Sequence, residues 1–188
     1  MIEENLREVL RSIEESRARR TVANPDEPVL LVAVTKNHEV AEMREAIDGG
    51  VTDIGENRIQ EAREKFDTLE RDAVWHLIGH LQKNKAKYAV RLFDLIHSVD
   101  TLELAAALDK EAEKIGKVQD VLVQVNLAKE ASKSGIYEED LQPMLEAVDA
   151  LPHLHLCGLM CIAPNYDDVE ETRPLFRHMY EIFQRIKG

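Results

Sequence analysis

Two features that many proteins rely on are scarce in this chain: cysteine and long apolar segments. Two cysteines occur among its 188 residues, so no disulfide framework is available, and we expect a reducing setting. The longest apolar runs, such as Val29–Val34, are far shorter than the roughly 20 residues that cross a bilayer. The first residues also lack the basic and apolar regions of a signal peptide. We therefore expect a cytoplasmic protein without a membrane span.

Positive charge is also in short supply. Lys and Arg total 24 against 36 for Asp and Glu, which gives a formal net charge of −12 at pH 7. An excess of negative charge repels phosphate backbones, so general nucleic-acid binding is not expected. What remains is ordinary globular composition, with 44% hydrophobic and 32% charged residues. The chain is long enough to bury a core without disulfides or a structural metal.

Six apolar segments typical of strands alternate with stripes of apolar residues at helical spacing. The first segment, Val29–Val34, shows no alternation with polar residues, so we expect both of its faces to be buried in a parallel sheet. An amphipathic helix precedes it, with apolar residues from Ile2 to Ile13 at helical spacing. Repeated βα units predict an α/β fold, either a doubly wound sheet or a (β/α)8 barrel. No domain boundary is visible, so we predict one domain over residues 1–188. The predicted strands are 29–34, 51–54, 74–78, 95–99, 121–125 and 154–159.

Polar or conformationally special residues follow all six predicted strands. In parallel α/β folds the chemistry collects at the carboxyl ends of the strands, so one convergent site would need this pattern. Lys36 is the most informative of these residues because it follows a wholly apolar strand almost directly. Partial desolvation there would favour a neutral amine, which can attack an aldehyde and form a Schiff base. A lysine that extends to the rim and only solvates it fits the same position equally well.

Two pairs of possible metal ligands are present, His76 with His80 and Cys157 with Cys161. The histidines fall in a strand-to-loop segment rather than on a helix, so their spacing does not make them converge. Cys157 lies within a predicted apolar strand and no second cysteine pair accompanies it, so we interpret both cysteines as small core residues. We predict no metal site. His80 is interpreted as a site residue because it follows the end of a strand.

Two further groups of cations stand out in an acidic chain. Lys83, Lys85, Lys87 and Arg91 form a basic cluster, which we interpret as a solvated helix face, with a docking patch for an anionic ligand as the alternative. Lys133 is a second amine near the strand ends, in the turn Ser132–Gly135. That turn has one glycine and only weakly resembles a phosphate-binding loop.

Seven short motifs occur in an order that is typical of one family. On these motifs, which extend from about Val29 to Ile162, the chain resembles the pyridoxal phosphate homeostasis protein family. The domain of that family is similar to the N-terminal domain of bacterial alanine racemase. The motifs are Ala33–Lys36, Gly55–Glu61, Trp75–Lys85, Ile96–Asp100, Val123–Asn126, Ser132–Gly135 and Gly158–Ile162.

The resemblance implies a (β/α)8 TIM-type barrel that binds pyridoxal 5′-phosphate (PLP) as an aldimine on Lys36. It also implies that Asn57, His80 and Met160 line the cofactor pocket. Family members are thought to carry and buffer PLP, and so to take part in vitamin B6 and amino-acid homeostasis, without robust catalysis. The implied partners are PLP and PLP-dependent apoenzymes that receive it, and we expect a monomer or a weak dimer.

Two enzymatic alternatives stay open at this stage. One is a PLP-dependent amino-acid racemase of low activity, in which Lys36 would act as the base. A racemase needs a second base, which in the alanine racemase fold comes from an additional β domain, and no such domain is visible in this sequence. The other is a Schiff-base aldolase that uses Lys36 without PLP, and the motif series argues against it.

The family pattern continues beyond the sixth βα unit, and the sequence does not. In the family, a seventh and an eighth strand lead into the loops that hold the phosphate and face the pyridine nitrogen. A (β/α)8 barrel takes at least about 200 residues, and six βα units account for all of this chain. We therefore expect a barrel truncated after its sixth βα unit, without those phosphate-binding segments.

Overall fold

The computed structural model describes residues 1–22, 24 and 26–187 of the chain. Helices and strands alternate along it, as the apolar pattern predicts. The chain packs as two compact units, Met1–His76 and Leu77–Gly188. Gly188, the last residue of the predicted domain, lies outside the described residues, and the single domain over residues 1–188 stays a prediction. In the described part of the chain, no helix is both long and apolar enough to span a membrane.

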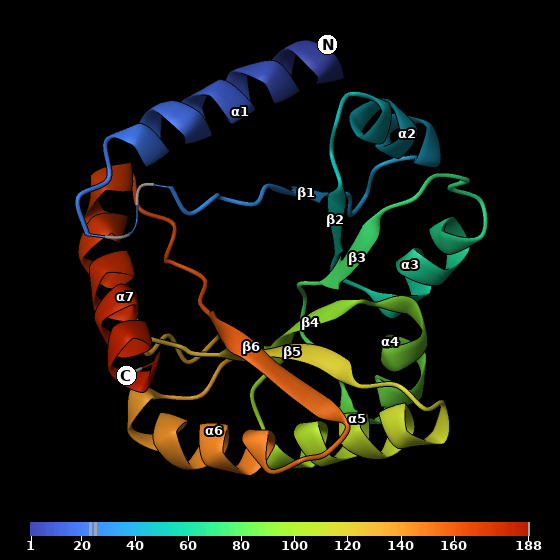
Figure 1. Cartoon of the computed structure of the whole chain (residues 1–188), viewed down its shortest axis with the longest axis vertical. Coiled ribbons are helices and arrows are strands. Elements are labelled where there is room, and N and C mark those ends of the chain that lie inside the picture. Colours follow the sequence, from blue (N-terminus) through green and yellow to red (C-terminus); the bar gives the residue numbers. More distant parts are fainter. Residues whose placement is uncertain (23, 25, 188) are drawn as a thin grey trace. The chain divides into compact units, whose positions relative to one another are not determined.

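The first unit is built on a parallel strand pair. Strands β1 and β2 run parallel with Val34 opposite Gly55. Strand β3 begins beside β2, because the Val74 amide donates to the Thr52 carbonyl at 2.9 Å. The unit contains α1 (Ile2–Ala18), β1 (Val32–Val34), α2 (Val40–Asp48), β2 (Asp53–Glu56), α3 (Ile59–Phe66) and most of β3 (Val74–Leu77), as labelled in Figure 1.

The predicted N-terminal helix is present as α1, and it lies against α2. Leu6 is its one buried residue among those described. Gly49, at the end of α2, leaves room for this contact, since a Cβ there would lie 3.2 Å from Leu6 Cδ2. The periodicity of the apolar residues therefore predicted the helix correctly, although most of its surface is exposed to solvent.

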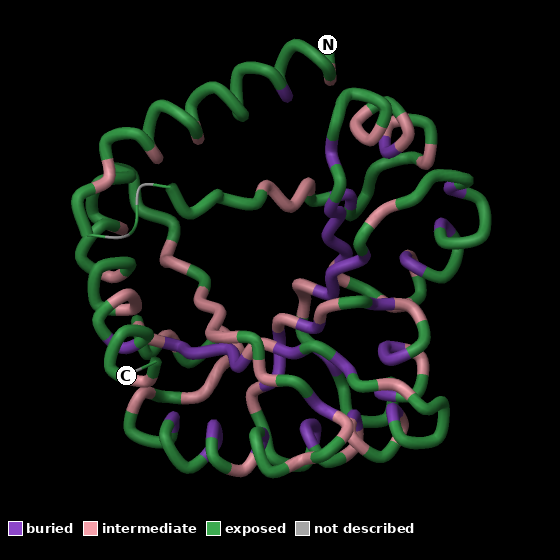
Figure 2. The backbone as a smooth tube through the Cα atoms, viewed as in Figure 1, coloured by how far each residue is buried: buried purple, intermediate pink, exposed green. Residues whose placement is uncertain are grey.

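The expectation for the first strand was wrong. The strand covers only Val32–Val34 of the predicted 29–34, and Leu30 and Val34 are 60% and 47% exposed. Figure 2 shows β1 as intermediate to exposed, whereas β2 is buried along its whole length. The physical reason is that, among the described residues, β1 pairs with β2 along one edge only. A run without alternation shows that both faces are apolar, but not that both are covered.

The second unit holds three parallel strands in the order β4-β5-β6. Short 3-10 turns precede three of its helices, at Lys83–Lys85, Glu138–Asp140 and Val169–Thr172. Its helices and strands are α4 (Ala86–Leu92), β4 (Leu95–Val99), α5 (Leu102–Lys114), β5 (Gln119–Gln124), α6 (Leu141–Asp149), β6 (Leu154–Met160) and α7 (Arg173–Lys187).

The core of the second unit lies between its strands and the helices that follow them. Figure 1 shows α5 and α6 along one side of β5 and β6. Leu104 and Leu108 of α5 and Val121 and Val123 of β5 are almost fully buried. The leucines recur one helical turn apart, and the valines alternate along the strand, so each element presents one apolar side to the other. Thr101 caps α5 by accepting a hydrogen bond from the Leu104 amide.

Candidate functional site

Lys36 lies in the turn directly after β1, and its side chain is exposed. The residue before it, Thr35, is buried, and the Thr35 amide continues the ladder by donating to the Gly55 carbonyl at 2.9 Å. The Lys36 amine makes no hydrogen bond or ion pair with any residue that the structure describes. The amine is therefore available at the carboxyl end of a strand, but the expected partial desolvation of Lys36 was wrong, because its side chain is exposed.

Asn57 lies at the equivalent position after β2. Since Val34 is paired with Gly55, Lys36 and Asn57 each lie two residues beyond a matched pair. Asn57 is half-buried in the bend between β2 and α3. The structure therefore brings these two predicted site residues to neighbouring strand ends of the same unit.

A buried ion-pair triad lies beneath this edge. Lys65 of α3 is 8% exposed, and Glu56, the last residue of β2, is fully buried. The Lys65 ammonium donates to Glu56 Oε1 at 2.8 Å and to Glu61 Oε1 at 2.6 Å. Thr35 Oγ1 also donates to Glu56 Oε1, at 2.6 Å. We define Glu56, Lys65 and Glu61 as the buried triad.

The buried triad also holds the backbone around Lys36. The Lys65 ammonium donates to the Thr35 carbonyl at 2.8 Å, and the Asn37 amide donates to Glu61 Oε1 at 2.5 Å. Asn37 has a left-handed backbone with φ 62°, a conformation that asparagine tolerates better than most residues. After this turn, α2 begins with a capping box in which Glu39 and Glu42 exchange side-chain and backbone hydrogen bonds.

The charges of the buried triad stabilise one another. Burial disfavours the charged form of Lys65, but its hydrogen bonds to Glu56 and Glu61 outweigh that effect and raise its pKa. The hydrogen bond from Lys65 lowers the pKa of Glu61, against a smaller opposing effect of burial. Both shifts favour the charged forms, so Lys65 and Glu61 are an ion pair at neutral pH.

The sequence reasoning missed this triad as part of the site. Its signal was present: Glu61 and Lys65 are spaced i, i+4 with the acid first, and Glu56 directly follows a buried strand. Glu56 and Glu61 belong to the family motif Gly55–Glu61, and Lys65 lies outside all seven motifs. Charges in such a pattern are usually solvent-exposed, and nothing in the sequence states that Lys65 turns inward to meet Glu56.

The second unit contains the other two predicted site residues. His80 is exposed in the loop after β3, and its Nδ1 lies 3.2 Å from Ser134 Oγ. Met160 is half-buried at the last position of β6, where its carbonyl accepts a hydrogen bond from the Val125 amide at 2.8 Å. The four residues are thus divided between the units, two in each, and their convergence into one pocket stays a prediction.

The turn Ser132–Gly135 connects several strand ends of the second unit. Ser134 reaches His80, and Lys133 Nζ donates to the Ala163 carbonyl, beyond β6, at 3.3 Å. The Gly135 amide donates to Asp100 Oδ2, just after β4, at 3.0 Å. Asn126, after β5, closes the turn from within by donating to the Glu130 carbonyl at 2.8 Å. Loops after β3, β4, β5 and β6 are therefore held by one turn, in which Lys133 is already engaged.

His76, the other half of the H-x3-H spacing, serves a different purpose. Its Nε2 lies 2.7 Å from Asp53 Oδ1, and both side chains are buried within the first unit. Asp53 Oδ2 also accepts a hydrogen bond from Thr52 Oγ1 at 2.6 Å. This pair links β2 with β3 and places His76 in the core, which agrees with the interpretation that the spacing alone does not define a metal site.

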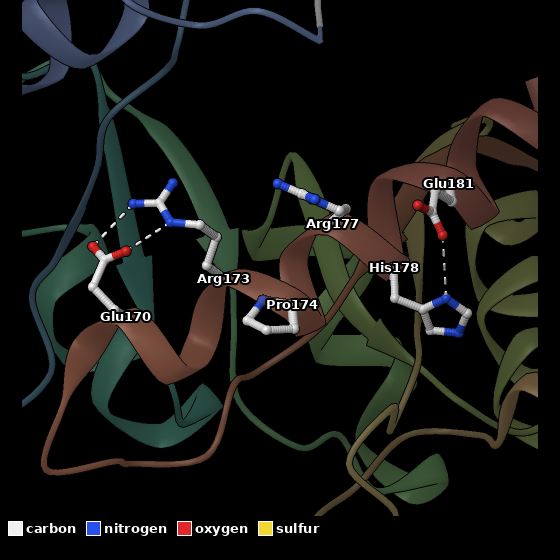
Figure 3. A pocket seen from close by; sticks show the side chains of 6 residues that line it. All are labelled: Glu170, Arg173, Pro174, Arg177, His178 and Glu181. Carbon is white, nitrogen blue, oxygen red and sulfur yellow. Dashed lines mark hydrogen bonds and ion pairs between the residues drawn. The ribbon is translucent and has the colours of Figure 1, made fainter.

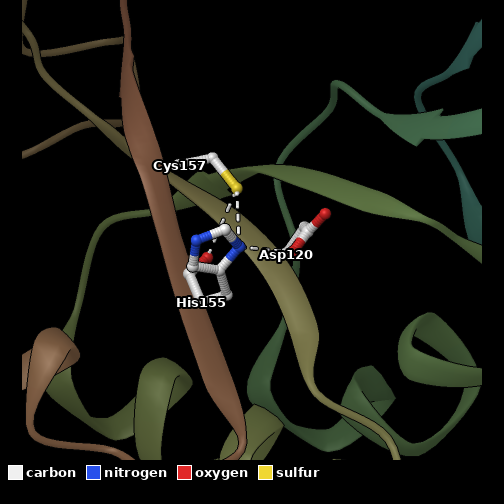
Figure 4. A group of neighbouring side chains, drawn as sticks. All are labelled: Asp120, His155 and Cys157. Atoms are coloured by element: carbon white, nitrogen blue, oxygen red, sulfur yellow. Dashed lines mark hydrogen bonds and ion pairs between the residues drawn. The ribbon is translucent and has the colours of Figure 1, made fainter.

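The interpretation of Cys157 as a core residue was wrong. Cys157 lies on the exposed side of β6, where it groups with His155 and with Asp120 of β5 (Figure 4). The residues of β6 alternate between its two faces, and the position of Cys157 matches that of the exposed His155, not that of the buried Leu154. Cys161, after the strand, is half-buried.

This group of three has ligand types that suit a metal, but its chemistry argues against a reactive thiol. Asp120 Oδ1 and Cys157 Sγ both approach the same atom, His155 Nδ1, at 2.8 and 3.5 Å. A catalytic relay would use the two different ring nitrogens. Partial burial, together with the negative charge of Asp120, raises the pKa of the Cys157 thiol, so the thiol stays protonated at neutral pH.

A surface hollow lies along α7 (Figure 3). Its polar side chains are largely paired: Arg173 donates to Glu170 at 2.7 and 2.9 Å, and His178 lies 2.7 Å from Glu138 and 3.8 Å from Glu181. Arg177 and Pro174 complete the lining. None of the four predicted site residues lines this hollow, so it does not compete with the strand ends as the candidate site.

Known proteins are similar to this chain in both sequence and fold. The alanine racemase N-terminal domain family matches residues 10–188. The chain is 33% identical to the pyridoxal phosphate homeostasis protein of Pasteurella multocida (strain Pm70), over 99% of this chain and 80% of that protein. It is 37% identical to the protein of that name from Escherichia coli (strain K12), over 90% of this chain and 74% of that protein.

Solved structures agree. PipY of Synechococcus elongatus PCC7942, a structure with PLP bound, matches with a TM-score of 0.83 and 37% identity, over 100% of this chain and 82% of that one. An alanine racemase of Clostridium difficile 630 matches with a TM-score of 0.72 at 17% identity, over 98% and 48% of the two chains, which shows the fold alone. These matches confirm the predicted α/β class with its racemase-like barrel topology. The chain therefore belongs to the pyridoxal phosphate homeostasis protein family.

Proposed function

We propose that this chain binds PLP through the Lys36 amine and carries the cofactor as part of vitamin B6 homeostasis, without robust catalysis. The observation that supports this most directly is the state of Lys36. Its amine is exposed and makes no bond to any described residue, while the residues on either side of it are anchored. When bound, PLP supplies an aldehyde that an uncharged amine can attack.

The donor set at this edge fits such a ligand. Asn57 adds a half-buried amide one strand away from Lys36, in the same unit. His80 and Met160, in the other unit, keep their predicted role as pocket residues. The relatives bear the name of pyridoxal phosphate homeostasis proteins, and one structural neighbour was solved with PLP bound. The proposed protein partners are PLP-dependent apoenzymes, to which the chain would transfer its PLP.

Exposure of Lys36 favours a carrier over an enzyme. An amine open to solvent allows the cofactor to enter and leave, whereas turnover generally needs a closed site that excludes water. A racemase also needs a second base on the opposite side of the substrate carbon. The Lys36 amine can act from one side only, so it does not supply both bases. The low-activity racemase therefore ranks behind the carrier.

The test uses the purified chain titrated with PLP and followed by its visible absorption. We expect a new band that saturates with PLP, and after borohydride reduction a PLP adduct on the peptide that contains Lys36. Lys36→Ala should lose the adduct, whereas Lys133→Ala, which removes the lysine already bonded to Ala163, should retain it. An adduct that survives in Lys36→Ala would refute the assignment. Formation of D-alanine from L-alanine, abolished in Lys36→Ala, would instead support the racemase.

A further inference from the structure

The residues around Lys36 show an arrangement that goes beyond the binding of PLP itself. Two peptide groups flank the Cα atom of Lys36, and both are bonded to the buried triad. The carbonyl of the first, from Thr35, accepts from the Lys65 ammonium at 2.8 Å. The amide of the second, from Asn37, donates to Glu61 Oε1 at 2.5 Å. Since these two groups define φ and ψ of Lys36, one ion pair holds both backbone angles.

The bonding of Lys65 is complete. An ammonium has three donors, and Lys65 directs them to the Thr35 carbonyl, Glu56 Oε1 and Glu61 Oε1, at 2.6 to 2.8 Å. Glu56 is fully buried, and its Oε1 also accepts from Thr35 Oγ1. A long side chain that is held at three points has few other rotamers, so it transmits the position of α3 to the turn.

The turn also has a backbone hydrogen bond of its own, from the His38 amide to the Thr35 carbonyl at 3.1 Å, but this bond does not reach α3. The left-handed Asn37 makes its backbone donation to Glu61, and the exposed Lys36 side chain makes no bond to a described residue. Thr35 is anchored to β2 by its amide and hydroxyl. Without Glu61, the segment after Thr35 would lose its connection to α3.

We infer that the buried triad is a positioning device, which fixes the backbone of Lys36 and thereby the point from which its side chain presents the amine to an aldehyde. The inference rests on the proposed function, since it concerns the amine that would bind PLP. Lys65 and Glu61 act here through Lys36 and are positioning residues; they do not themselves touch the cofactor. A purely structural role would tie α3 to β2 without any consequence for the chemistry of Lys36.

The experiment compares three variants of one helix. Glu61→Ala removes the acceptor of the Asn37 amide and leaves the Lys65–Glu56 pair in place. Glu61→Gln keeps an oxygen that can accept from both Asn37 and Lys65. Glu64→Ala is the matched control, because Glu64 is exposed on the same helix and its side chain bonds only to Gln60 among the described residues.

The first measurement needs no cofactor. Hydrogen exchange resolved to single residues within Thr35–His38 separates the Asn37 amide from the His38 amide, which donates to the Thr35 carbonyl. We expect Glu61→Ala to exchange there at least about tenfold faster than the wild type, a change typical of a lost hydrogen bond to a charged acceptor. Glu61→Gln should exchange at an intermediate rate, and Glu64→Ala at the wild-type rate.

The second measurement is the pH profile of PLP capture, read from the absorption of the bound cofactor. We expect Glu61→Ala to capture PLP roughly tenfold more slowly at every pH between neutral and alkaline, with partial rescue in Glu61→Gln. Thermal unfolding monitored by circular dichroism should show all three variants folded. If Glu61→Ala exchanges faster but captures PLP at the wild-type rate, the positioning inference is wrong while the proposed function stands. If the wild type forms no adduct at Lys36, the proposed function itself fails.

Discussion

Different interactions hold the loops at the strand ends of the two units. In the first unit, a buried ammonium and two carboxylates hold the turn that carries Lys36. In the second, the turn Ser132–Gly135 is held by contacts of Asn126, by a bond from the Gly135 amide to Asp100 Oδ2, and by a glycine in close contact with the backbone. The first anchor depends on a buried ammonium, and the second depends on the small size of a glycine. Both leave a lysine nearby, but only the Lys36 amine makes no bond to the described residues.

This difference suggests what each anchor is for. An ion pair fixes direction strongly as long as both partners are charged, which suits a backbone that must present an amine. A glycine turn allows the backbones of neighbouring loops to approach closely. The comparison predicts that charge-changing substitutions act on the first unit and volume-changing substitutions on the second.

The largest effect is expected from Lys65→Met, which keeps the length of the side chain and removes its charge. Glu56 and Glu61 would then face each other in a buried site without a cation. Breaking a buried ion pair on one side typically costs about 3–5 kcal/mol, so we expect a loss of that size in the free energy of unfolding measured with urea. The double variant Lys65→Met with Glu56→Gln should recover part of it. A loss below about 1 kcal/mol would show that the triad contributes little.

The next largest effect is expected from Gly135→Ala in the second unit. Gly135 has φ 114°, and a Cβ there would lie 2.8 Å from the Asn126 amide nitrogen. Because this neighbour is backbone, the turn itself has to move, and we expect a destabilisation of about 2–3 kcal/mol. Gly116→Ala is the control, since Gly116 also has a positive φ, 63°, with no atom within 4 Å. It should cost only about 1 kcal/mol, and equal losses in the two variants would contradict the steric explanation.

The response to pH tests the charged anchor of the first unit. The folded state lowers the pKa of Glu61 below its ordinary 4.5, so the stabilisation from Glu61 is complete above that value and is lost as the pH falls below it. The folded state raises the pKa of Lys65 above its ordinary 10.5, so its contribution is complete below 10.5 and is lost as the pH rises past the raised value. The stability gap between the wild type and Lys65→Met should therefore narrow in acid. Urea unfolding measured from neutral pH to below the ordinary pKa of 4.5 checks this narrowing.

The helices and strands were predictable because buried apolar residues recur in the sequence at the spacing of a helix or a strand. Strand β4 was predicted at its observed bounds, 95–99, and the helix predicted across Ala86–Leu92 is α4. The bounds and burial of strand β1 were not predicted correctly, because an apolar run does not indicate whether neighbouring elements cover it. Cys157 was misplaced for a related reason: its neighbours in sequence are apolar, but the alternation within β6 places it on the exposed face.

The sequence predicted the site residues that directly follow strands. It did not predict the residues that join the site through tertiary contacts. Lys36 and Asn57 follow their strands directly, so the strand pattern alone brings them to one edge. The triad joins the end of β2 to a residue on α3, nine positions further along the chain. Only the packing of α3 against β2 decides that Lys65 turns inward, and no local pattern encodes that.

The smallest effect is expected from Lys133→Ala, and it tests the comparison at the level of single lysines. Lys133 Nζ bonds to the Ala163 carbonyl at 3.3 Å and to Glu130 at 3.2 Å, while about 29% of its side chain stays exposed. Such partly exposed pairs contribute about 0–1 kcal/mol, so we expect a loss below 1 kcal/mol in urea unfolding and an unchanged PLP adduct at Lys36. A lysine that is already bonded differs from Lys36 in just the property that the carrier proposal needs. If Lys133→Ala abolished the adduct as fully as Lys36→Ala does, the proposal that the unbonded Lys36 amine is what binds PLP would be contradicted.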